Sequence, residues 1–525
     1  VASVTSSNAT NAGTSGTPIF KAGADNFSLA ATTTGIAGNA SGYTGVLKVN
    51  SAAMQVVSPA TAVGSITPST FPAATTGTPS STATGATFTY SEVGGFQFRG
   101  YNPASDTTSP RGIYDGVSSA TECAALTAGQ CDALRAATWM GIDSITSKGD
   151  CVQNSYSNTR DVNGKYGCSF GLIADSAVFG RFVPNHYALV AAPTLTLTNR
   201  SSLSCVPSSS FTYLAEPFRL TNFRLEAQNA ANTRTQNYIG ALVKLDVTDG
   251  SRFGVLTGTT ALNAQPSGTS RIATSASGTN AWQTSGALGS TNILSVDVTV
   301  ARKTGPAAGD NDPDGAFTSV EIGIAPVDTD GVTLAPSTMN RDWAAPTGND
   351  HQLFSSTNLR YGRLALLNGY GSELTPIPNP IAAAPFLMQA QYYDSNTGFV
   401  RNVDDDCTAV PLAQLSLRSA VEGVAPAAAI VATNPIRVKG TVTTQASLAT
   451  VTMVDGNAGL SFSAPGAGGD GFVDVQAAVL NFPWLRYDWD GDNNYNEATG
   501  DDPTARITFG IYRGNPRHIY LREIY

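Results

Sequence analysis

Residues 483–525 read PWLRYDWDGDNNYNEATGDDPTARITFGIYRGNPRHIYLREIY, the part of the chain that is densest in aromatic and charged residues. After an acidic loop, apolar residues occupy every second position from Ile507 to Ile511, which is the period of a half-buried β-strand. Residues 514–516, Gly-Asn-Pro, supply a turn, and residues 518–525 form a second strand-like stretch. The stretch therefore predicts a β-hairpin at this end of the chain.

Short strands of the same kind recur upstream, separated by turn-rich segments. They include TLTLTN (194–199), ALVKLDV (241–247), ILSVDVTVAR (293–302) and GFVDVQAAV (471–479). Regular short strands without helices between them are typical of antiparallel sheets rather than βαβ units. The sequence predicts an all-β protein of tandem immunoglobulin-like β-sandwich domains with a small disulfide-stapled insert.

The strand pattern and the composition divide the chain into four parts. We expect an N-terminal segment plus a first β-sandwich over 1–104, the stapled insert over 105–180, a second β-sandwich over 181–350, and a C-terminal β-sandwich with the terminal hairpin over 351–525. Within the first part, Phe88 and Tyr90, then Gly94-Gly95, then Phe96 and Phe98 predict another hairpin with a glycine turn.

The first 35 residues are small and polar, with no charged side chain before Lys21. They predict either a flexible leader or an extended strand that pairs with another subunit, because strand addition relies on backbone bonds. If copies of the chain assemble, we expect this segment, and not the terminal hairpin, to cross between them. The start at Val1 rather than Met predicts a processed, exported chain.

The composition is that of a turn-rich extracellular protein with packed cores. The 525 residues include 52 Gly and 28 Pro, only 13% are charged and 41% are hydrophobic, which argues against global disorder. A net charge of −9 without basic runs argues against nucleic acid and anionic membrane surfaces as partners. No run of about 18 apolar residues is present, so no membrane span is expected.

The six cysteines are interpreted as disulfides in an oxidising compartment. Their spacing predicts the pairs Cys123–Cys131, Cys151–Cys168 and Cys205–Cys407 among the alternatives. No CxxC motif and only three histidines, His186, His351 and His518, give zinc little support.

Two acidic loops have oxygen-bearing side chains at alternate positions, the pattern that Ca²⁺ requires for its about six to eight oxygen ligands. The first offers Asp488, Asp490, Asp492 and Asn494, and the second offers Asp310, Asp312 and Asp314. Calcium is the cofactor predicted for both, and a solvated acidic turn is the alternative in each case. A third cluster, residues 404–406 beside Cys407, predicts an exposed loop.

Catalytic patterns are absent from the sequence. It contains no G-x-S-x-G elbow, no H-E-x-x-H, no P-loop and no G-x-G-x-x-G after a strand. We expect His518 to be an ordinary strand residue and the protein not to be an enzyme.

Several motifs resemble one known family. They are WLRYDWDGD, DDPTARITFGIYRGN and IYLREIY in the closing stretch, with FTYSEVGGFQF (88–98), GRFVPNHYAL (180–189), FTYLAEPFRL (211–220), LRYGRLALLNGYGSE (359–373) and GFVRNVDDDCT (398–408) upstream. Together they resemble the C-terminal region of MshQ-type proteins, which are linked to biogenesis of the mannose-sensitive haemagglutinin pilus. The resemblance implies a large secreted bacterial surface protein without known chemistry. Larger family members carry a lectin-like module before this region; no stretch of this sequence is assigned to such a module, so sugar binding is not implied.

The expected function is that of a non-enzymatic extracellular structural protein, which forms or decorates a bacterial pilus-like surface filament by β-strand pairing. Its expected partners are copies of itself or other pilus and surface components. The main alternative is a monomeric pilus-associated adhesin or carbohydrate-binding module that uses the stapled insert, and a third is a hydrolase with paired carboxylates in a cleft.

Overall fold

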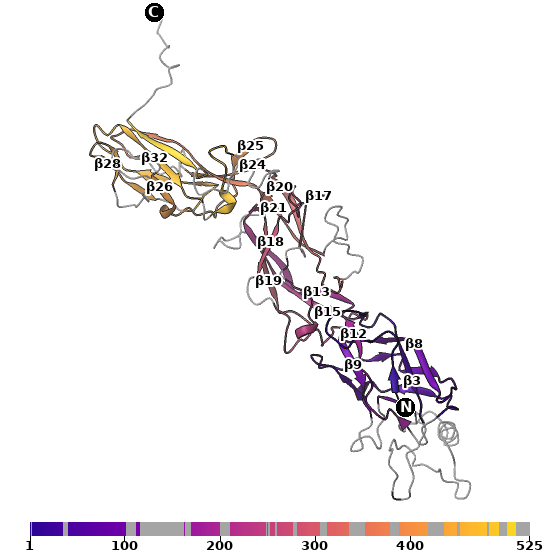
Figure 1. Ribbon diagram of the computed structural model, residues 1–525. Helices are drawn as coiled ribbons and strands as arrows, with labels where there is room; N and C mark the ends of the chain where they lie inside the picture. The colour runs from indigo at the N-terminus through magenta and orange to yellow at the C-terminus, as the bar shows by residue number, and fades with distance from the viewer. Residues whose placement is uncertain are drawn as a thin grey trace, which may run out of the picture.

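The computed structural model describes residues 1, 3–34, 40–100, 112–115, 162, 170–199, 211–247, 249, 253–257, 260–276, 281–304, 312–334, 352–377, 388–417, 435–448, 452–479, 482–492 and 501–510. These residues form an all-β structure with no helix of seven residues or more, which confirms the predicted class. Within these ranges, no helix has the length and apolar character that a membrane crossing requires. The strands form three modules that follow one another in an elongated body (Figure 1).

Module 1 contains three four-stranded sheets, with the strand orders β1-β3-β8-β6, β2-β12-β9-β5 and β11-β10-β4-β7. Phenylalanine rings fill its core: Phe27, Phe96 and Phe182 are fully buried, with ring centroids 5.2 to 6.1 Å apart. Its elements are β1 Ser3–Thr5, β2 Phe20–Lys21, β3 Phe27–Thr32, β4 Val46–Val49, η1 Ser51–Ala53, β5 Met54–Val56, β6 Ile66–Thr67, β7 Thr70–Ala73, β8 Thr82–Tyr90, β9 Gly94–Phe98, β10 Ile113–Asp115, β11 Phe170–Gly171 and β12 Phe179–Val183.

Module 2 contains a four-stranded sheet, β13-β15-β19-β18, and a five-stranded sheet, β14-β21-β20-β16-β17. Side chains of both sheets meet in one core, for example Val296 and Val298 of the first sheet with Val320 and Ile322 of the second. Its elements are β13 His186–Thr198, β14 Phe211–Tyr213, β15 Pro217–Gln228, η2 Gly240–Leu242, β16 Phe253–Thr257, β17 Thr260–Ala261, β18 Ile272–Ala276, β19 Leu294–Val300, β20 Phe317–Ile324 and β21 Gln352–Arg360.

Module 3 contains the sheets β22-β24-β25, with β30 also on β24, and β23-β33-β32-β26, together with the pairs β27-β28 and β29-β31. Its elements are β22 Gly362–Leu366, β23 Gly369–Gly371, β24 Met388–Asp394, β25 Gly398–Arg401, η5 Leu412–Gln414, β26 Leu415–Leu417, β27 Ile436–Lys439, β28 Val442–Thr444, β29 Ala446–Leu448, β30 Asn457–Ala458, β31 Leu460–Phe462, β32 Gly471–Ala477, η6 Pro483–Leu485 and β33 Thr504–Phe509.

The three modules share one plan at their first strand. In each module the chain first pairs antiparallel with the following long strand, in the pairs β1–β3, β13–β15 and β22–β24. It then crosses to the other sheet and pairs parallel with the last strand, in the pairs β2–β12, β14–β21 and β23–β33. The first two strands of each module therefore belong to different sheets and tie two of its sheets together.

The hairpin predicted around Gly94-Gly95 does not form. β8 pairs with β3 and β6, whereas β9 pairs with β12 and β5 in a different sheet. The turn at Gly94, which has a φ of +97°, leads from one sheet to the other. The aromatic residues meet across the core instead of along a ladder, and the Tyr90 and Phe96 ring centroids lie 4.5 Å apart.

The N-terminal segment is part of module 1, so the flexible-leader interpretation is wrong. β1 pairs with β3, and β2 pairs with β12 of the same chain. Val1 is 2% exposed, and its amino group donates to the Gly171 carbonyl at 2.9 Å. The segment does form extended strands, as the alternative interpretation predicted, but these strands pair within the same chain and not with another subunit.

The structure describes only the first arm of the predicted terminal hairpin, so the hairpin stays a prediction. Its first arm is β33, which pairs with β23 along one edge and with β32 along the other. The second arm, residues 518–525, lies outside the described residues. In the described residues, β32 pairs with β33 over residues 504–509 and β23 pairs with it over 507–509.

The predicted insert over 105–180 falls mostly outside the described residues. Its described parts, β10, β11 and the start of β12, belong to sheets of module 1. The first module therefore continues beyond the predicted border at residue 104 and ends with β12.

Candidate metal centre and module junctions

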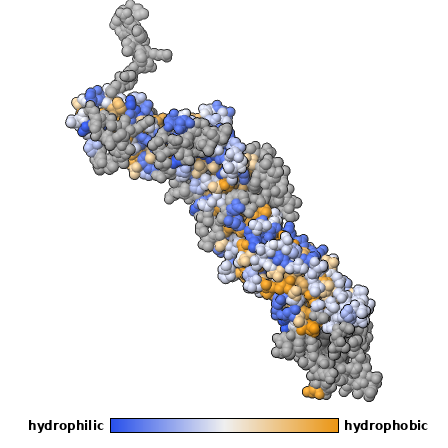
Figure 2. All heavy atoms as spheres, viewed as in Figure 1, coloured by the Kyte–Doolittle hydropathy of each residue, from blue (hydrophilic) through white to orange (hydrophobic). Residues whose placement is uncertain are grey.

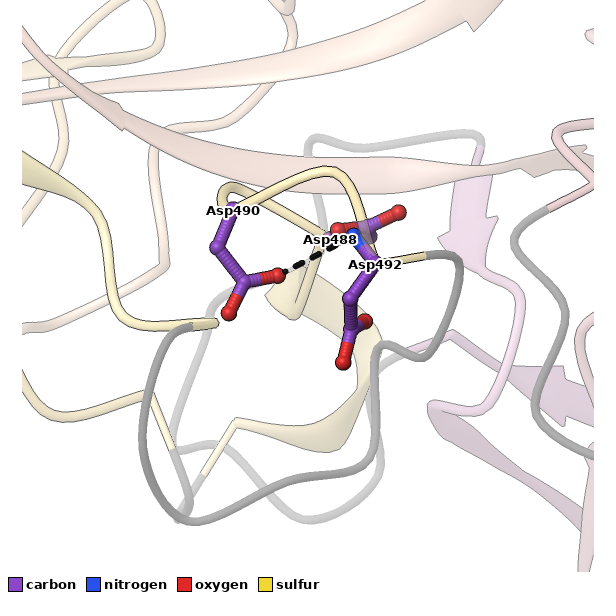
Figure 3. A group of neighbouring side chains, drawn as sticks. All are labelled: Asp488, Asp490 and Asp492. Carbon is purple, nitrogen blue, oxygen red and sulfur yellow. Dashed lines mark hydrogen bonds between the residues drawn. The ribbon is translucent and has the colours of Figure 1, made fainter.

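Three carboxylates converge in the loop that follows η6. Asp488, Asp490 and Asp492 each place a carboxylate oxygen within 4.8 Å of the others, and Figure 3 shows the three side chains on one tight loop. The Gly491 N–H donates to Asp488 Oδ1 at 2.6 Å, and the Asp492 N–H donates to Asp490 Oδ1 at 3.3 Å. Gly491 has a φ of +80°, which a glycine adopts without a steric penalty.

The donor set fits a hard cation. Calcium binds oxygen at about 2.3–2.6 Å, so two ligand oxygens on one ion lie at most about 5 Å apart. The spacing of the three carboxylates is within that limit. Three like charges this close repel one another, and a divalent ion would offset that repulsion. Asn494, the fourth predicted ligand, lies outside the described residues, and calcium in this loop stays a prediction.

An arginine surrounded by aromatic rings anchors the acidic loop. The Arg363 guanidinium carbon lies 3.7 Å from the Phe399 ring centroid, 4.8 Å from that of Trp489 and 4.9 Å from that of Tyr487. Tyr487 and Phe399 also pack against the core of module 2. The acidic loop is therefore held at the border between modules 2 and 3.

The second predicted calcium loop contains carboxylates that pair with cationic side chains. Asp312 contacts Lys303 at 2.6 Å, and Asp314 contacts Arg271 at 2.9 Å. Burial raises the pKa of Asp314, and Arg271 opposes that shift. Asp310 lies outside the described residues. The protein itself supplies the cations for these two groups, which weakens the prediction of calcium here.

The third acidic cluster is not simply an exposed loop. Asp405 is fully buried and accepts hydrogen bonds from Tyr213 Oη at 2.8 Å and Thr408 Oγ1 at 2.7 Å. Asp404 pairs with Arg360 at 2.6 Å. Because Tyr213 belongs to β14 of module 2, Asp405 joins two modules.

Arg302 forms the centre of the junction between modules 2 and 3. Its side chain follows β19 and is almost fully buried. The guanidinium donates to the carbonyl of Gly362 at 2.6 Å and to those of Trp484 and Arg486, all in module 3. It also lies 4.3 Å from the centroid of the Tyr361 ring.

A buried ion pair and the side chain of one asparagine hold the junction between modules 1 and 2. Arg181 of β12 forms a two-pronged ion pair with Asp330, both contacts at 2.7 Å, and only 2% of the Arg181 side chain is exposed. The Asn237 side chain accepts from the backbone of Thr61 and Ala62 and donates to the carbonyls of Ala62 and Val93. All four bonds cross from module 2 to module 1.

Glu92 is the second carboxylate at this border. Its oxygens accept from the backbone N–H groups of Val93, Gln236 and Asn237 at 2.9 to 3.0 Å. Burial raises the pKa of Glu92, and the three backbone donors oppose that shift. The side chain is 7% exposed, beside an open hollow of about 400 Å³ that Asn229, Arg234 and Gln236 also line.

The hydrophobic cores cross the module borders as well. Ala60 and Val93 of module 1 belong to the core of module 2, and Phe211 and Tyr213 of module 2 belong to the core of module 3. Each module therefore buries part of the preceding one, and the three are not independent beads.

Cys407 is disulfide-bonded. The other five cysteines lie outside the described residues, so the predicted pairing stays a prediction. The Tyr213 hydroxyl donates to Asp405, which places β14 beside the segment that contains Cys407.

Sequence reasoning found the acidic loop but missed the junction residues. Arg302 follows an alternating strand and Asn237 lies in a polar segment, positions that usually face solvent. Nothing in one sequence marks either as buried. His186 is 7% exposed and contacts Asn185 and Gln228, whereas His351 and His518 lie outside the described residues.

The sheets and junctions define an all-β protein of consecutive, interlocked modules. Residues 167–352 match the third domain of DUF6701, and residues 360–524 match the fourth. The two matches cover more than half of the chain, which therefore contains the third and fourth domains of the DUF6701 family. The link to MshQ-type proteins stays a prediction.

Other comparisons add little. No curated protein matches the sequence. Among solved structures, surface layer protein SbsC, domains 1-6, is similar at 8% identity with a TM-score of 0.14, and the match covers 92% of this chain and 53% of that one. The chain spans about half the length of that structure, and a likeness at this TM-score carries no argument about fold or function.

Proposed function

We propose that this chain is a non-enzymatic, exported structural protein, a stiff rod that forms or decorates a filament on a bacterial surface. The observation that carries the proposal is the continuity of the cores across both module borders. A flexible string of domains is expected to have small, polar interfaces, whereas here residues such as Arg302 and Phe211 are buried in the neighbouring module. Figure 2 shows hydrophilic and hydrophobic side chains interspersed along the visible face, with hydrophobic residues more frequent in its lower half.

The module plan supports an immunoglobulin-like assignment. A first strand that pairs antiparallel in one sheet and parallel to the last strand in the other links the two layers of a sandwich. Calcium in the loop at 488–492 is part of the proposal as a structural ion that would stiffen the border between modules 2 and 3. The partners proposed are further copies of the chain or other surface components.

Small-angle scattering and negative-stain imaging of the purified full chain test this function. A rod predicts one elongated shape with a narrow distribution of bend angles at each border, and a filament former also predicts ordered end-to-end or lateral association at high concentration. A broad distribution of bend angles would contradict the rod. If the particle is straight but never associates, the chain does not form the filament by itself. Decoration of another filament would then be tested by co-sedimentation with isolated surface filaments.

A further inference from the structure

The turn that follows the second strand occupies an equivalent place in all three modules. The second strands β2, β14 and β23 run parallel to the last strands β12, β21 and β33. Both strands of each pair therefore finish at the same end of the module, which we call its trailing end. The turn after the second strand begins at residue 22 in module 1, residue 214 in module 2 and residue 372 in module 3. We call these three turns the trailing turns.

Module 2 covers the trailing turn of module 1. The Ala22 N–H donates to the Val183 carbonyl at the end of β12 at 2.8 Å, and the Ala22 carbonyl accepts from the Ala230 N–H of module 2 at 3.0 Å. Ala22 is fully buried, and a Cβ on Gly23 would lie 3.4 Å from the Ala230 nitrogen. The backbone of this trailing turn is therefore part of the border between modules 1 and 2.

Module 3 covers the trailing turn of module 2. The Leu214 N–H donates to the Arg360 carbonyl at the end of β21 at 2.8 Å, as the equivalent N–H does in module 1. Tyr213 and Leu214 are fully buried. The Tyr213 hydroxyl accepts from Asn402 of module 3 at 2.6 Å and donates to Asp405 at 2.8 Å. Each trailing turn that a further module follows is therefore in contact with that module.

The trailing turn of module 3 is exposed. It is likewise bonded to the end of the last strand, because the Gly510 N–H donates to the Gly371 carbonyl at 2.9 Å. Tyr370 of β23 is 64% exposed and Leu374 in the turn is 63% exposed. They are the two most exposed large apolar side chains of module 3 among those described. A surface that the two preceding modules bury against a neighbour thus faces outward here.

Charged side chains flank this surface. A Cβ on Gly510 would lie 2.5 Å from Glu373 Oε2 and 3.1 Å from Asp470 Cβ, so both acids lie at the trailing end. Asp470 pairs with Lys439 at 2.7 Å, and this ion pair is exposed. Single exposed apolar side chains are common on soluble proteins, but two of them inside a charged rim have the composition of a protein–protein contact.

The partner that fits this surface is the leading end of another module, which is the end where its first strand begins. At both borders the covering residues lie there. Gly362, the first residue of β22, would place a Cβ 2.6 Å from the Tyr213 ring, and Ala230 follows Gln228, the partner of His186 at the start of β13. The leading ends of modules 2 and 3 already contact modules 1 and 2, so a second copy of the chain would offer its module 1.

The leading end of module 1 has an exposed apolar side chain of its own. Ile173 is 46% exposed, and its N–H donates to the Val1 carbonyl at 3.1 Å, just before β1 begins. Modules 1 and 3 lie at opposite ends of the elongated body (Figure 1). An exposed apolar side chain at one end can therefore meet the apolar pair at the other end of a second copy.

We propose that the trailing turn of module 3, with Tyr370 and Leu374, is the docking surface for the leading end of module 1 of a second copy. The two surfaces differ, so the contact runs head to tail, and its repetition builds an open filament. Neighbouring copies then follow one another as modules do within the chain. This inference rests on the proposed function and names the surface through which the copies associate.

Sedimentation velocity of the full chain, with substitutions at both ends, tests the proposal. Leu374→Asp places a charge in the apolar contact and should lower the association constant at least about tenfold. Ile173→Asp should lower it to a similar degree. The control is Val454→Asp, at an exposed apolar site beside the Asp406 turn, and it should not change association. Because all three side chains are exposed, the melting temperature of each variant should equal that of the wild type.

An equimolar mixture of the Leu374→Asp and Ile173→Asp chains gives the sharpest result. Each variant keeps one intact surface, so the mixture should form dimers and no longer species. If the wild type polymerises and the mixture forms no dimer, the pairing of these two ends is wrong.

Two further results would overturn the proposal, and they separate it from the filament function. If Leu374→Asp and Tyr370→Ser leave the association constant unchanged, the copies meet elsewhere, and the filament stands without this surface. If the wild type stays monomeric at its highest soluble concentration, the docking surface is wrong. The rod and its decoration of another filament are then tested separately, by scattering and co-sedimentation.

Discussion

The Arg302 guanidinium of module 2 lies 4.3 Å from the centroid of the Tyr361 ring and donates to three carbonyls of module 3. Replacement by Leu leaves those carbonyls without their donor in a buried place. We expect Arg302→Leu to destabilise the junction by about 1–3 kcal/mol for each carbonyl left unsatisfied and to split the unfolding of modules 2 and 3 into two transitions in a denaturant titration. Arg401→Leu, at an exposed arginine of β25, is the control, and an equal effect of both variants would refute a special role for Arg302.

Glu92 gives the junction of modules 1 and 2 a pH dependence with a definite sign. Burial raises its pKa above the usual value of 4.5, so the folded state holds the proton more tightly than the unfolded state. The stability that Glu92 contributes is fully present below the unfolded pKa and is lost as the pH rises through the folded pKa. The free energy of unfolding of the wild type minus that of Glu92→Gln should therefore increase as the pH falls from neutral towards 4.5. A difference that is constant or decreases over this range would show that the carboxylate is not buried as described.

The acidic loop after η6 predicts sensitivity to chelation. If Asp488, Asp490 and Asp492 hold Ca²⁺ in the folded state only, an ion at a hundredfold excess over its Kd stabilises the chain by about 2.7 kcal/mol. Chelation should then lower the melting temperature, and Asp490→Ala should abolish that sensitivity. Asp470→Asn, at an exposed acid of the same module, should leave it intact. A melting temperature that chelator does not change supports the solvated turn.

The disulfide at Cys407 predicts a covalent link between modules. Non-reducing peptide mapping should recover a peptide that joins Cys407 to Cys205, and Cys407→Ser should expose one free thiol at Cys205. Loss of a disulfide that closes so long a loop is expected to cost about 2–4 kcal/mol. Recovery of Cys407 joined to any other cysteine would exclude this pairing.

Deletion of residues 1–30 should unfold module 1. The deletion removes β1, β2 and most of β3, including Phe27 and Leu29, which are fully buried. Each large apolar side chain lost from a core costs about 2–5 kcal/mol, so the first module should lose its cooperative melting transition. An unchanged melting transition of module 1 would contradict the place of these strands in its core.

The sequence predicted the strands well where side-chain packing alone decides them. The stretch 293–300 became β19, with Leu294, Val296 and Val298 facing the core as their alternation indicated. The alternate spacing of Asp488, Asp490 and Asp492 likewise predicted that they converge.

The prediction of strands failed where a side chain takes the backbone N–H groups that pairing with a neighbouring strand would use. ALVKLDV alternates like a strand, yet residues 243–247 form none in the structure. The buried hydroxyl of Tyr238 accepts the N–H groups of Lys244 and Leu245 at 2.9 and 3.0 Å, which occupies backbone donors that a strand would use. Arg302 and Asn237 were missed for a related reason: their partners are backbone atoms of another module, and no local pattern encodes those contacts.

The parallel pairing between the second and the last strand of each module determines how the module responds when its ends are pulled apart. The chain enters a module through its first two strands and leaves through its last strand. In module 2, the second of these strands, β14 (Phe211–Tyr213), lies parallel to residues 358–360 of the last strand, β21. Tension applied along the rod would slide these two strands past each other, so their hydrogen bonds would be loaded together in shear rather than opened one at a time. Forced unfolding is governed by the unfolding rate, and a shear arrangement repeated in all three modules would make the whole chain resist extension at every module alike.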